Sequence, residues 1–148
     1  MIIISPYAKE LPRGGANPKN YVHWPQLIAL INQPIVQVGV SGETPLVPDF
    51  RTNLSLPELS QLILQSHTWI SVDSMFQHLC WDLGKPGIVL WGQSNPEIYG
   101  HPENVNLLKG REYLFHNQFL SWDLIPQRND CFVSPEKVVE VLNNHFPA

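Results

Sequence analysis

The clearest signal of fold class in this chain is the stretch WISVDSMFQHLCWDLGKPGIVLWG, residues 69–92. Its residues predict a buried strand over 68–72, a helix over 74–83 and a second buried strand over 87–91. A strand, a sharp turn, a helix and a strand in this order make up the basic unit of a parallel α/β sheet.

The turn of this unit lies at Asp73-Ser74, where the strand runs directly into the helix. The first N–H groups of a helix have no partner inside the helix, and they carry the positive end of its dipole. Such a helix start is a favourable place for a phosphate or diphosphate. The junction therefore predicts an anion site.

The same alternation continues on both sides of this stretch. Apolar β-branched runs predict further strands at 2–5, 35–40 and 105–108, and helical spacing predicts helices at 24–31, from Leu56 after a Ser55 cap, and from Pro135 after a Ser134 cap. Residues 41–53, 93–103 and 110–130 show no clear period and are expected to be loops, the last with a short helix. We therefore predict an α/β fold. It is a single Rossmann-like domain over residues 1–148, with a mostly parallel sheet of about five strands and helices on both faces. Ligands of such sheets bind at the carboxyl ends of the strands.

The amino-acid composition argues against several classes of ligand and partner. The 148 residues carry a formal net charge of −4, which argues against nucleic acid as a partner. The two cysteines are isolated and lack metal-ligand spacing, so neither a metal nor a cofactor is expected. No apolar run approaches the roughly 20 residues of a membrane span. The opening MIIIS has no features of a signal peptide, and a cytoplasmic location is expected.

Two short motifs, one in the central stretch and one directly after it, resemble the heptosyltransferase-like glycosyltransferases. Residues 73–79, DSMFQHL, are similar to the family's Asp-Ser/Thr-Gly-x-x-His-Leu turn, and residues 92–96, GQSNP, are similar to its Gly-x-x-x-Pro loop. Upstream, residues 17–24 resemble the Lys-x-Trp-Pro segment that opens the family's first helix, and residues 39–43 resemble a segment that ends in a glutamate.

The resemblance implies one half of a GT-B enzyme, in which two Rossmann-like halves face a cleft. This chain resembles the C-terminal half, which binds the nucleoside diphosphate sugar. The acceptor-side half, with the family's usual catalytic carboxylate, has no counterpart here. The resemblance thus leaves three sources for a general base: a homodimer partner, a separate acceptor-domain chain, or a residue that the sequence does not identify. Met75 replaces the usual glycine of the family, so we expect a variation of the donor site rather than its loss.

The junction supplies four candidate ligand contacts. The amides of Met75 and Phe76 are the expected anion donors, and the Ser74 hydroxyl either donates to phosphate or caps the helix. His78 lies one turn after Ser74. Protonated, it would stabilise a leaving diphosphate; alternatively, it is a helix histidine without a role. Asp73 is expected to fix the turn.

Three further candidates come from other strand ends. Lys19 would neutralise diphosphate charge, Ser5 would touch phosphate, and Glu43 would accept hydrogen bonds from ribose hydroxyls. For Lys19 and Glu43 the alternative is an exposed loop residue.

We therefore expect a glycosyltransferase, or the donor-binding subunit of one, that binds a nucleoside diphosphate sugar. The alternatives are a non-catalytic nucleotide-binding or regulatory module, and an interaction protein derived from a glycosyltransferase half. For the last, the aromatic-rich residues 113–122 would form an interface or cover one edge of the sheet.

Overall fold

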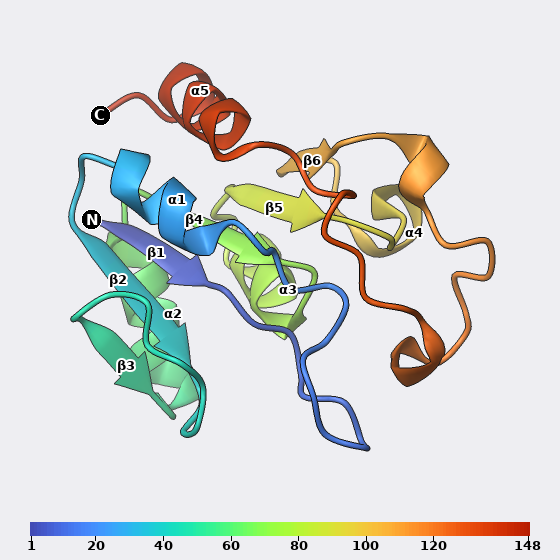
Figure 1. Cartoon of the computed structure of the whole chain (residues 1–148). Coiled ribbons are helices and arrows are strands. Elements are labelled where there is room, and N and C mark those ends of the chain that lie inside the picture. Colours follow the sequence, from blue (N-terminus) through green and yellow to red (C-terminus); the bar gives the residue numbers. More distant parts are fainter.

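A computed structural model describes all 148 residues, and its centre is a sheet of six parallel strands (Figure 1). The strands are β1 Ile2–Ser5, β2 Ile35–Gly39, β3 Phe50–Thr52, β4 Thr68–Val72, β5 Ile88–Trp91 and β6 Val105–Leu108. Their order across the sheet is β3-β2-β1-β4-β5-β6. This is the strand order of doubly wound nucleotide-binding sheets, and the direction of winding reverses between β1 and β4. The predicted α/β fold is confirmed, with six strands where about five were expected.

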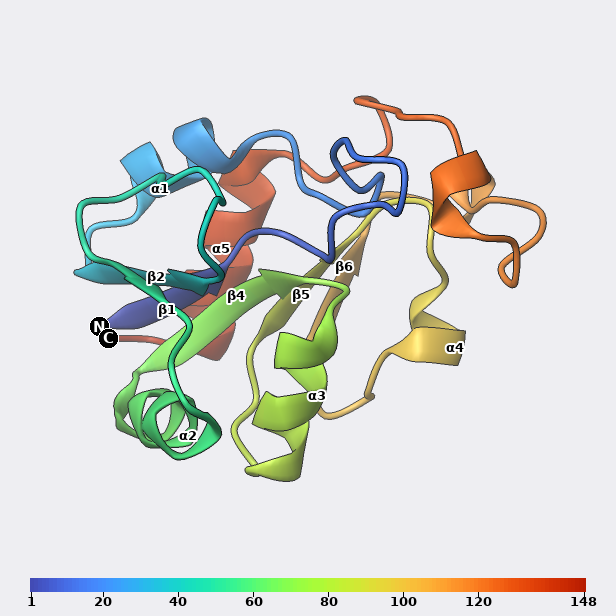
Figure 2. The same cartoon turned by 90° about the horizontal axis from the view of Figure 1, so that it is seen from below.

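Helices cover both faces of the sheet. They are α1 Trp24–Leu30, α2 Leu56–Gln65, α3 Met75–Asp82, α4 Pro96–Tyr99 and α5 Pro135–His145, with the short 3-10 turns η1 Arg111–Tyr113 and η2 Trp122–Leu124. Figure 2 shows α1 and α5 on one side of the sheet and α2 and α3 on the other. None of the helices combines the length and the apolar character that a bilayer crossing requires.

The two faces of the sheet carry separate apolar clusters. Successive side chains of a strand point to opposite faces, so Ile2 and Ile4 join the cluster under α1 and α5, while Ile3 joins the cluster over α2 and α3. All three are fully buried. Burial on both faces explains why these strands appear in the sequence as continuous apolar runs rather than as alternating ones.

Two predicted helix starts are confirmed by their caps. Ser55 Oγ accepts the N–H of Glu58 at 3.3 Å, and Ser134 Oγ accepts the N–H of Lys137 at 3.2 Å. In both helices a proline occupies the first turn, where its missing N–H costs nothing.

The loops contain two elements that the sequence did not predict. β3 lies inside the expected 41–53 loop, and α4 lies inside the expected 93–103 loop. β3 has three residues on the sheet edge, none of them buried, so it carries no apolar pattern. α4 is a single turn that the Asn95 side chain caps by accepting the N–H of Glu97 at 3.0 Å.

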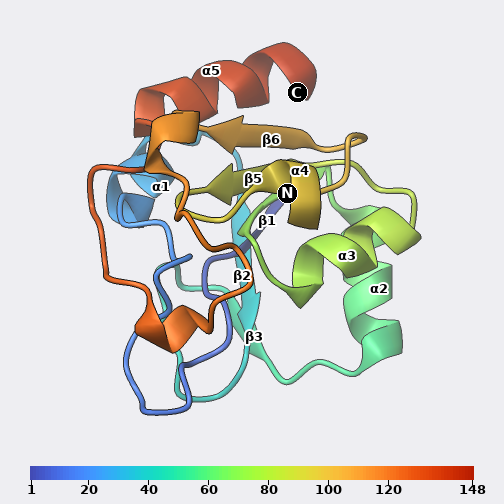
Figure 3. The same cartoon turned by 90° about the vertical axis from the view of Figure 1, so that its right-hand side faces the viewer.

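Residues 109–130 form a long return segment between β6 and α5. In Figure 3 this orange segment leaves the end of β6 and brings η2 down beside the blue loop that follows β1. Gln127 Nε2 donates to the carbonyl of Ala16 at 2.5 Å, which ties the two loops together. The segment therefore reaches the carboxyl ends of the central strands.

Candidate functional site

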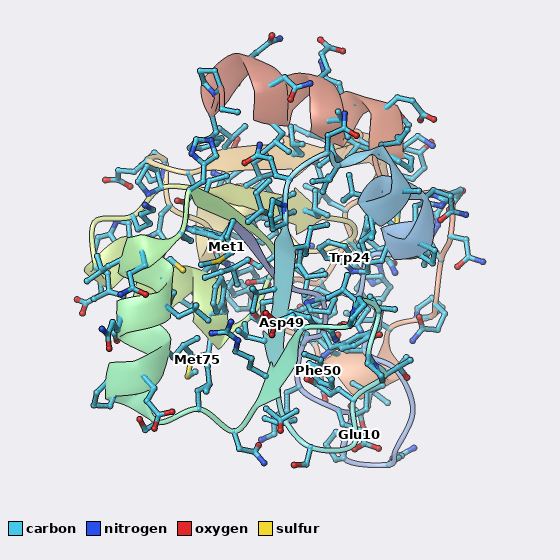
Figure 4. The ribbon with its side chains drawn as sticks, turned by 90° about the vertical axis from the view of Figure 1, so that its left-hand side faces the viewer. Met1, Glu10, Trp24, Asp49, Phe50 and Met75 are labelled. Carbon is cyan, nitrogen blue, oxygen red and sulfur yellow. The ribbon has the colours of Figure 1, made fainter.

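A cavity of about 1270 Å³ opens at the carboxyl ends of β1, β2 and β4, where the winding of the sheet reverses. Small-molecule sites typically occupy about 300–1,000 Å³, so the space is ample for a ligand. Its walls come from residues 5–20, 38–44, 51–59, 73–76 and 121–123. Figure 4 shows two of the lining residues, Met75 and Glu10, on opposite sides of β3.

Six of the seven predicted site residues line this one cavity, namely Ser5, Lys19, Glu43, Ser74, Met75 and Phe76. They arrive from the ends of β1, β2 and β4 and from the loop between β1 and α1. The structure does not bring the seventh, His78, together with them. Their roles toward a ligand stay predictions.

The start of α3 presents a helix end without a side-chain cap. Ser74 occupies the cap position with extended backbone, but its hydroxyl makes no capping hydrogen bond. Ser74 Oγ is buried and has no hydrogen-bond partner in the chain. No acidic side chain lies in the first turn. The first amides of α3 are therefore without a side-chain acceptor, and a hydroxyl beside them has unused hydrogen-bonding capacity.

The next two residues divide their roles between the cavity and the core. Met75 is 70% exposed, and its side chain stands at the cavity wall. Phe76 is buried against Trp69, with the two ring centroids 5.6 Å apart in an edge-to-face arrangement. This packing fixes the first turn of α3 to the sheet, and with it the direction of the exposed amides.

A buried ion pair lies directly beside this helix end. Lys19 Nζ is 3.0 Å from Asp73 Oδ2, with only 17% and 6% of the two side chains exposed. Asp73 Oδ2 accepts no hydrogen bond, so its contact with Lys19 is an ion pair without hydrogen-bond geometry. Asp73 Oδ1 accepts the side-chain amide of Gln77 at 2.8 Å. Sequence reasoning placed Lys19 and Asp73 in the same region, but it did not foresee that one would neutralise the other.

Two aromatic rings also lie close to the ammonium group. Lys19 Nζ lies 4.7 Å from the ring centroid of Trp122 and 5.8 Å from that of Tyr99. A cation over an aromatic face is attracted by the negative ring centre. Trp122 lies about a hundred residues along the chain from Lys19, and no local signal in the sequence links the two. The expected interface or edge-covering segment, residues 113–122, thus ends at the cavity.

Hydrogen bonds within the β1–α1 loop hold the backbone of Lys19. Asn17 Oδ1 accepts the N–H of Lys19 at 3.0 Å, and Asn17 Nδ2 donates to the carbonyl of Lys9 at 3.0 Å. Asn20 Oδ1 accepts the N–H of Ala8 at 2.8 Å. The turn-forming residues of this loop therefore build a fixed platform, and the ammonium position follows from it.

Glu43 lies after β2, at the other side of the cavity. Its Oε1 accepts the N–H of Val40 at 2.8 Å and occupies the space next to Gly39, where an added Cβ would be only 2.0 Å away. Burial raises the pKa of the Glu43 carboxyl, and the hydrogen bond from Val40 partly opposes this. Gln37 fixes the loop by donating to the carbonyl of Thr44 at 3.0 Å. The need for glycine at position 39 was not recognised from the sequence.

His78 faces away from the cavity, toward the loop after α4. Its Nδ1 is 2.7 Å from Nε2 of His101, and the His101 ring stacks on Trp81 with centroids 4.4 Å apart. Burial lowers the pKa of His78, and the neighbouring His101 lowers it further. One helical turn puts Ser74 and His78 on one stripe of α3, but the cavity meets only the first turn of that stripe.

The charges of the cavity wall are nearly balanced. Its basic residues are Lys9, Lys19 and Arg51, and its acidic residues are Glu10, Glu43, Asp73 and Asp123. No group of three or more histidine, cysteine, aspartate or glutamate side chains is placed to hold a metal ion. Any anion bound here would therefore rely on the helix end and on Lys19 rather than on a broadly positive surface.

The Gly92–Pro96 loop supports the return segment instead of lining the cavity. A Cβ at Gly92 would be 2.6 Å from the Phe132 ring, so the close approach requires glycine. Gln93 Nε2 donates to the carbonyl of Pro126 at 2.8 Å, and the N–H of Asn95 donates to Gln118 at 2.8 Å. This loop thereby helps to hold the segment that carries Trp122.

Residues 47–112 match the family model of glycosyltransferase family 9 (heptosyltransferase). Neither a curated protein nor a solved structure gave a match. The matched residues contain the start of α3 and the Gly92–Pro96 loop, but they exclude Ser5, Lys19 and Glu43. From β3 to η1, this chain is similar to glycosyltransferase family 9, as its central motifs indicate, over a partial segment that fits a half-domain resemblance.

Proposed function

We propose that this chain binds a nucleoside diphosphate sugar in the cavity and serves glycosyl transfer as a donor-binding unit. The family match supports a glycosyltransferase-related function. One observation carries the finer proposal. Ser5, Lys19, Glu43 and the start of α3 come from separate elements and line a single cavity at the point where the winding of the sheet reverses.

The diphosphate is assigned to the first turn of α3. There the amides of Met75 and Phe76 would donate to phosphate oxygens, and the dipole favours negative charge. Ser74 Oγ, buried without a partner, would gain one. The hydroxyl of Ser5 would complete this end of the site.

The ribose is assigned to Glu43, at the end of β2. A carboxylate at the end of the second strand of such a sheet accepts hydrogen bonds from ribose hydroxyls. Glu43 Oε1 is engaged by Val40, so Oε2 would make the contact. The diphosphate and the ribose would then lie at the ends of β4 and β2, on the two sides of β1.

In transfer, the diphosphate is the leaving group, and charge develops on it as the bond to the sugar breaks. Fixed donors that face such a developing charge stabilise the transition state. The start of α3 and Lys19 would supply them. His78 lies outside the cavity, so a leaving-group role would require it to turn away from His101.

Calorimetric titration with UDP-, GDP- and ADP-sugars and with the free nucleotides tests the proposal. Ser74→Ala and Lys19→Ala should each weaken binding of the best ligand. Hydrogen bonds to charged groups contribute about 1.5–3 kcal/mol, which corresponds to roughly 10- to 150-fold in Kd. Lys109→Ala is the matched control, because Lys109 is exposed and its ammonium donates to the carbonyl of Asp130, outside the cavity. Failure of every nucleotide to bind would overturn the proposal.

One observation favours a non-catalytic module as the second candidate. Lys19 already shares its charge with Asp73, and acidic residues outnumber basic ones on the cavity wall by four to three. Less positive charge is then left to stabilise a leaving diphosphate. A module would bind the nucleotide sugar without releasing the sugar. Sugar release can be followed over hours in the wild type and in both variants. Release by the wild type that is lost in Lys19→Ala and kept in Lys109→Ala would exclude the non-catalytic module.

A further inference from the structure

Gln77 has an unusual environment for a side-chain amide. It is fully buried in α3, and it joins the apolar residues Phe76 and Cys80 on the inward side of that helix. Its Nε2 donates to Asp73 Oδ1 at 2.8 Å, whereas its Oε1 is buried without any partner. An apolar side chain would avoid this unsatisfied acceptor, so packing alone does not account for glutamine here.

The hydrogen bond from Gln77 determines how Asp73 presents its second oxygen. With Oδ1 held by Gln77, Oδ2 points to Lys19 Nζ at 3.0 Å. Gln77 thus begins a chain of three side chains that ends at the ammonium group beside the first turn of α3.

The aromatic rings make the ammonium position depend on this chain. Trp122 and Tyr99 flank Lys19 Nζ and attract it, but a ring face fixes direction weakly. The Asp73 carboxylate makes the closest contact with the ammonium, at 3.0 Å, and the hydrogen bond from Gln77 to Oδ1 holds that carboxylate so that Oδ2 faces Lys19.

We propose that Gln77 is a positioning residue: it orients Asp73 so that Lys19 holds its charge beside the first amides of α3, where a diphosphate would bind. This proposal rests on the proposed function for its ligand, but the placement of Lys19 is testable without any ligand. Gln77 itself does not line the cavity.

Gln77→Met removes the hydrogen bond and the unsatisfied oxygen while it keeps a side chain of similar length. We expect a melting temperature close to that of the wild type, because the lost hydrogen bond to the buried Asp73 Oδ1 offsets the removal of the unsatisfied Gln77 oxygen. The ammonium signal of Lys19, observed by proton–nitrogen NMR, should shift or be lost through faster exchange with water. Affinity for inorganic pyrophosphate should fall about 5- to 50-fold. An unchanged Lys19 signal together with unchanged affinity would overturn the proposal.

Gln77→Glu provides a test within one folded protein. A protonated glutamic acid can donate to Asp73 Oδ1, whereas the carboxylate repels it. The charged or titratable groups nearest Gln77 are Asp73, its partner Lys19 and, on the same inward side of α3, Cys80; His78 and His101 lie on the outer side, and all five are unchanged in the variant. Pyrophosphate binding by Gln77→Glu, relative to the wild type at each pH, should therefore be strong at low pH and fall as pH rises. A constant ratio across the pH range would contradict the positioning role, even if Gln77→Met did not fold.

The two proposals fail in different ways. If wild-type protein binds neither pyrophosphate nor any nucleotide sugar, the proposed function fails, and the Lys19 signal in the Gln77 variants still decides the role of Gln77. If the wild type binds but the Gln77 variants behave like it, only the positioning role fails.

Discussion

Lys19→Met should destabilise the protein strongly for a change in a loop, because it leaves the Asp73 carboxylate buried without its ion-pair partner. The pair is 3.0 Å apart, and only 6% of the Asp73 side chain is exposed. Loss of one partner from a buried pair typically costs about 3–5 kcal/mol. The helix dipole would stabilise the remaining carboxylate by about 0.3–1 kcal/mol. Because Lys19 is itself 17% exposed, we expect a net cost of about 2–4 kcal/mol.

Urea unfolding followed by tryptophan fluorescence measures this cost, and a double-mutant cycle isolates the pair. Asp73→Asn keeps an oxygen for Gln77 but removes the charge, so in that background Lys19→Met should cost much less. The coupling energy should exceed about 1 kcal/mol, and because the pair is buried it should change little with salt. Lys109→Met, on the exposed surface, should stay within about 0.5 kcal/mol of the wild type. A coupling energy near zero would refute the argument that the pair is buried and linked.

Three further predictions each rest on a single contact. Folding raises the Glu43 pKa above its ordinary 4.5, so the stability that this residue contributes is present below that pH and is lost as pH rises. The melting temperature of Glu43→Gln relative to wild type should therefore increase between about pH 4 and pH 7, and a flat difference would contradict the sign. Folding lowers the His78 pKa below 6.5, so the contribution of His78 to stability is present above that value and is lost as pH falls. His101→Ala should raise the pKa of His78 measured by NMR. An unchanged pKa would show that His101 is not a cause of the shift. Gly92→Ala would place a methyl group 2.6 Å from the Phe132 ring and should lower the free energy of unfolding, measured by thermal unfolding, by about 1–3 kcal/mol. An unchanged stability would mean that the return segment moves to make room for the methyl group.

The parts of the fold that the sequence predicted are those with strong local signals. Apolar runs such as residues 2–5 and 68–72 predicted buried strands, and the Ser55 and Ser134 caps predicted helix starts. The parallel arrangement followed from the alternation of strands and helices. β3 was missed because it has three unburied residues on an edge, and pairing with β2, rather than its own pattern, makes it a strand.

The sequence predicted the candidate site from residues that lie at or after the ends of strands. The ends of β1, β2 and β4 bring Ser5, Glu43 and Ser74 to one edge of the sheet, which parallel topology requires. The pairing of Lys19 with Asp73 and the approach of Trp122 depend on how long loops fold back, and no spacing in the sequence encodes that. His78 shows the limit of helical spacing: sharing a stripe with Ser74 does not place it on the cavity.

The proposed function requires that the first amides of α3 bind the diphosphate of a nucleotide sugar. Amide chemical-shift mapping with inorganic pyrophosphate and with UDP-, GDP- and ADP-sugars tests it most directly. The largest shifts should fall on the N–H groups of Ser74, Met75 and Phe76, and the Lys19 ammonium should respond in the same titration. Binding that shifts only residues elsewhere, or no shift at any of these amides at millimolar ligand, would contradict it.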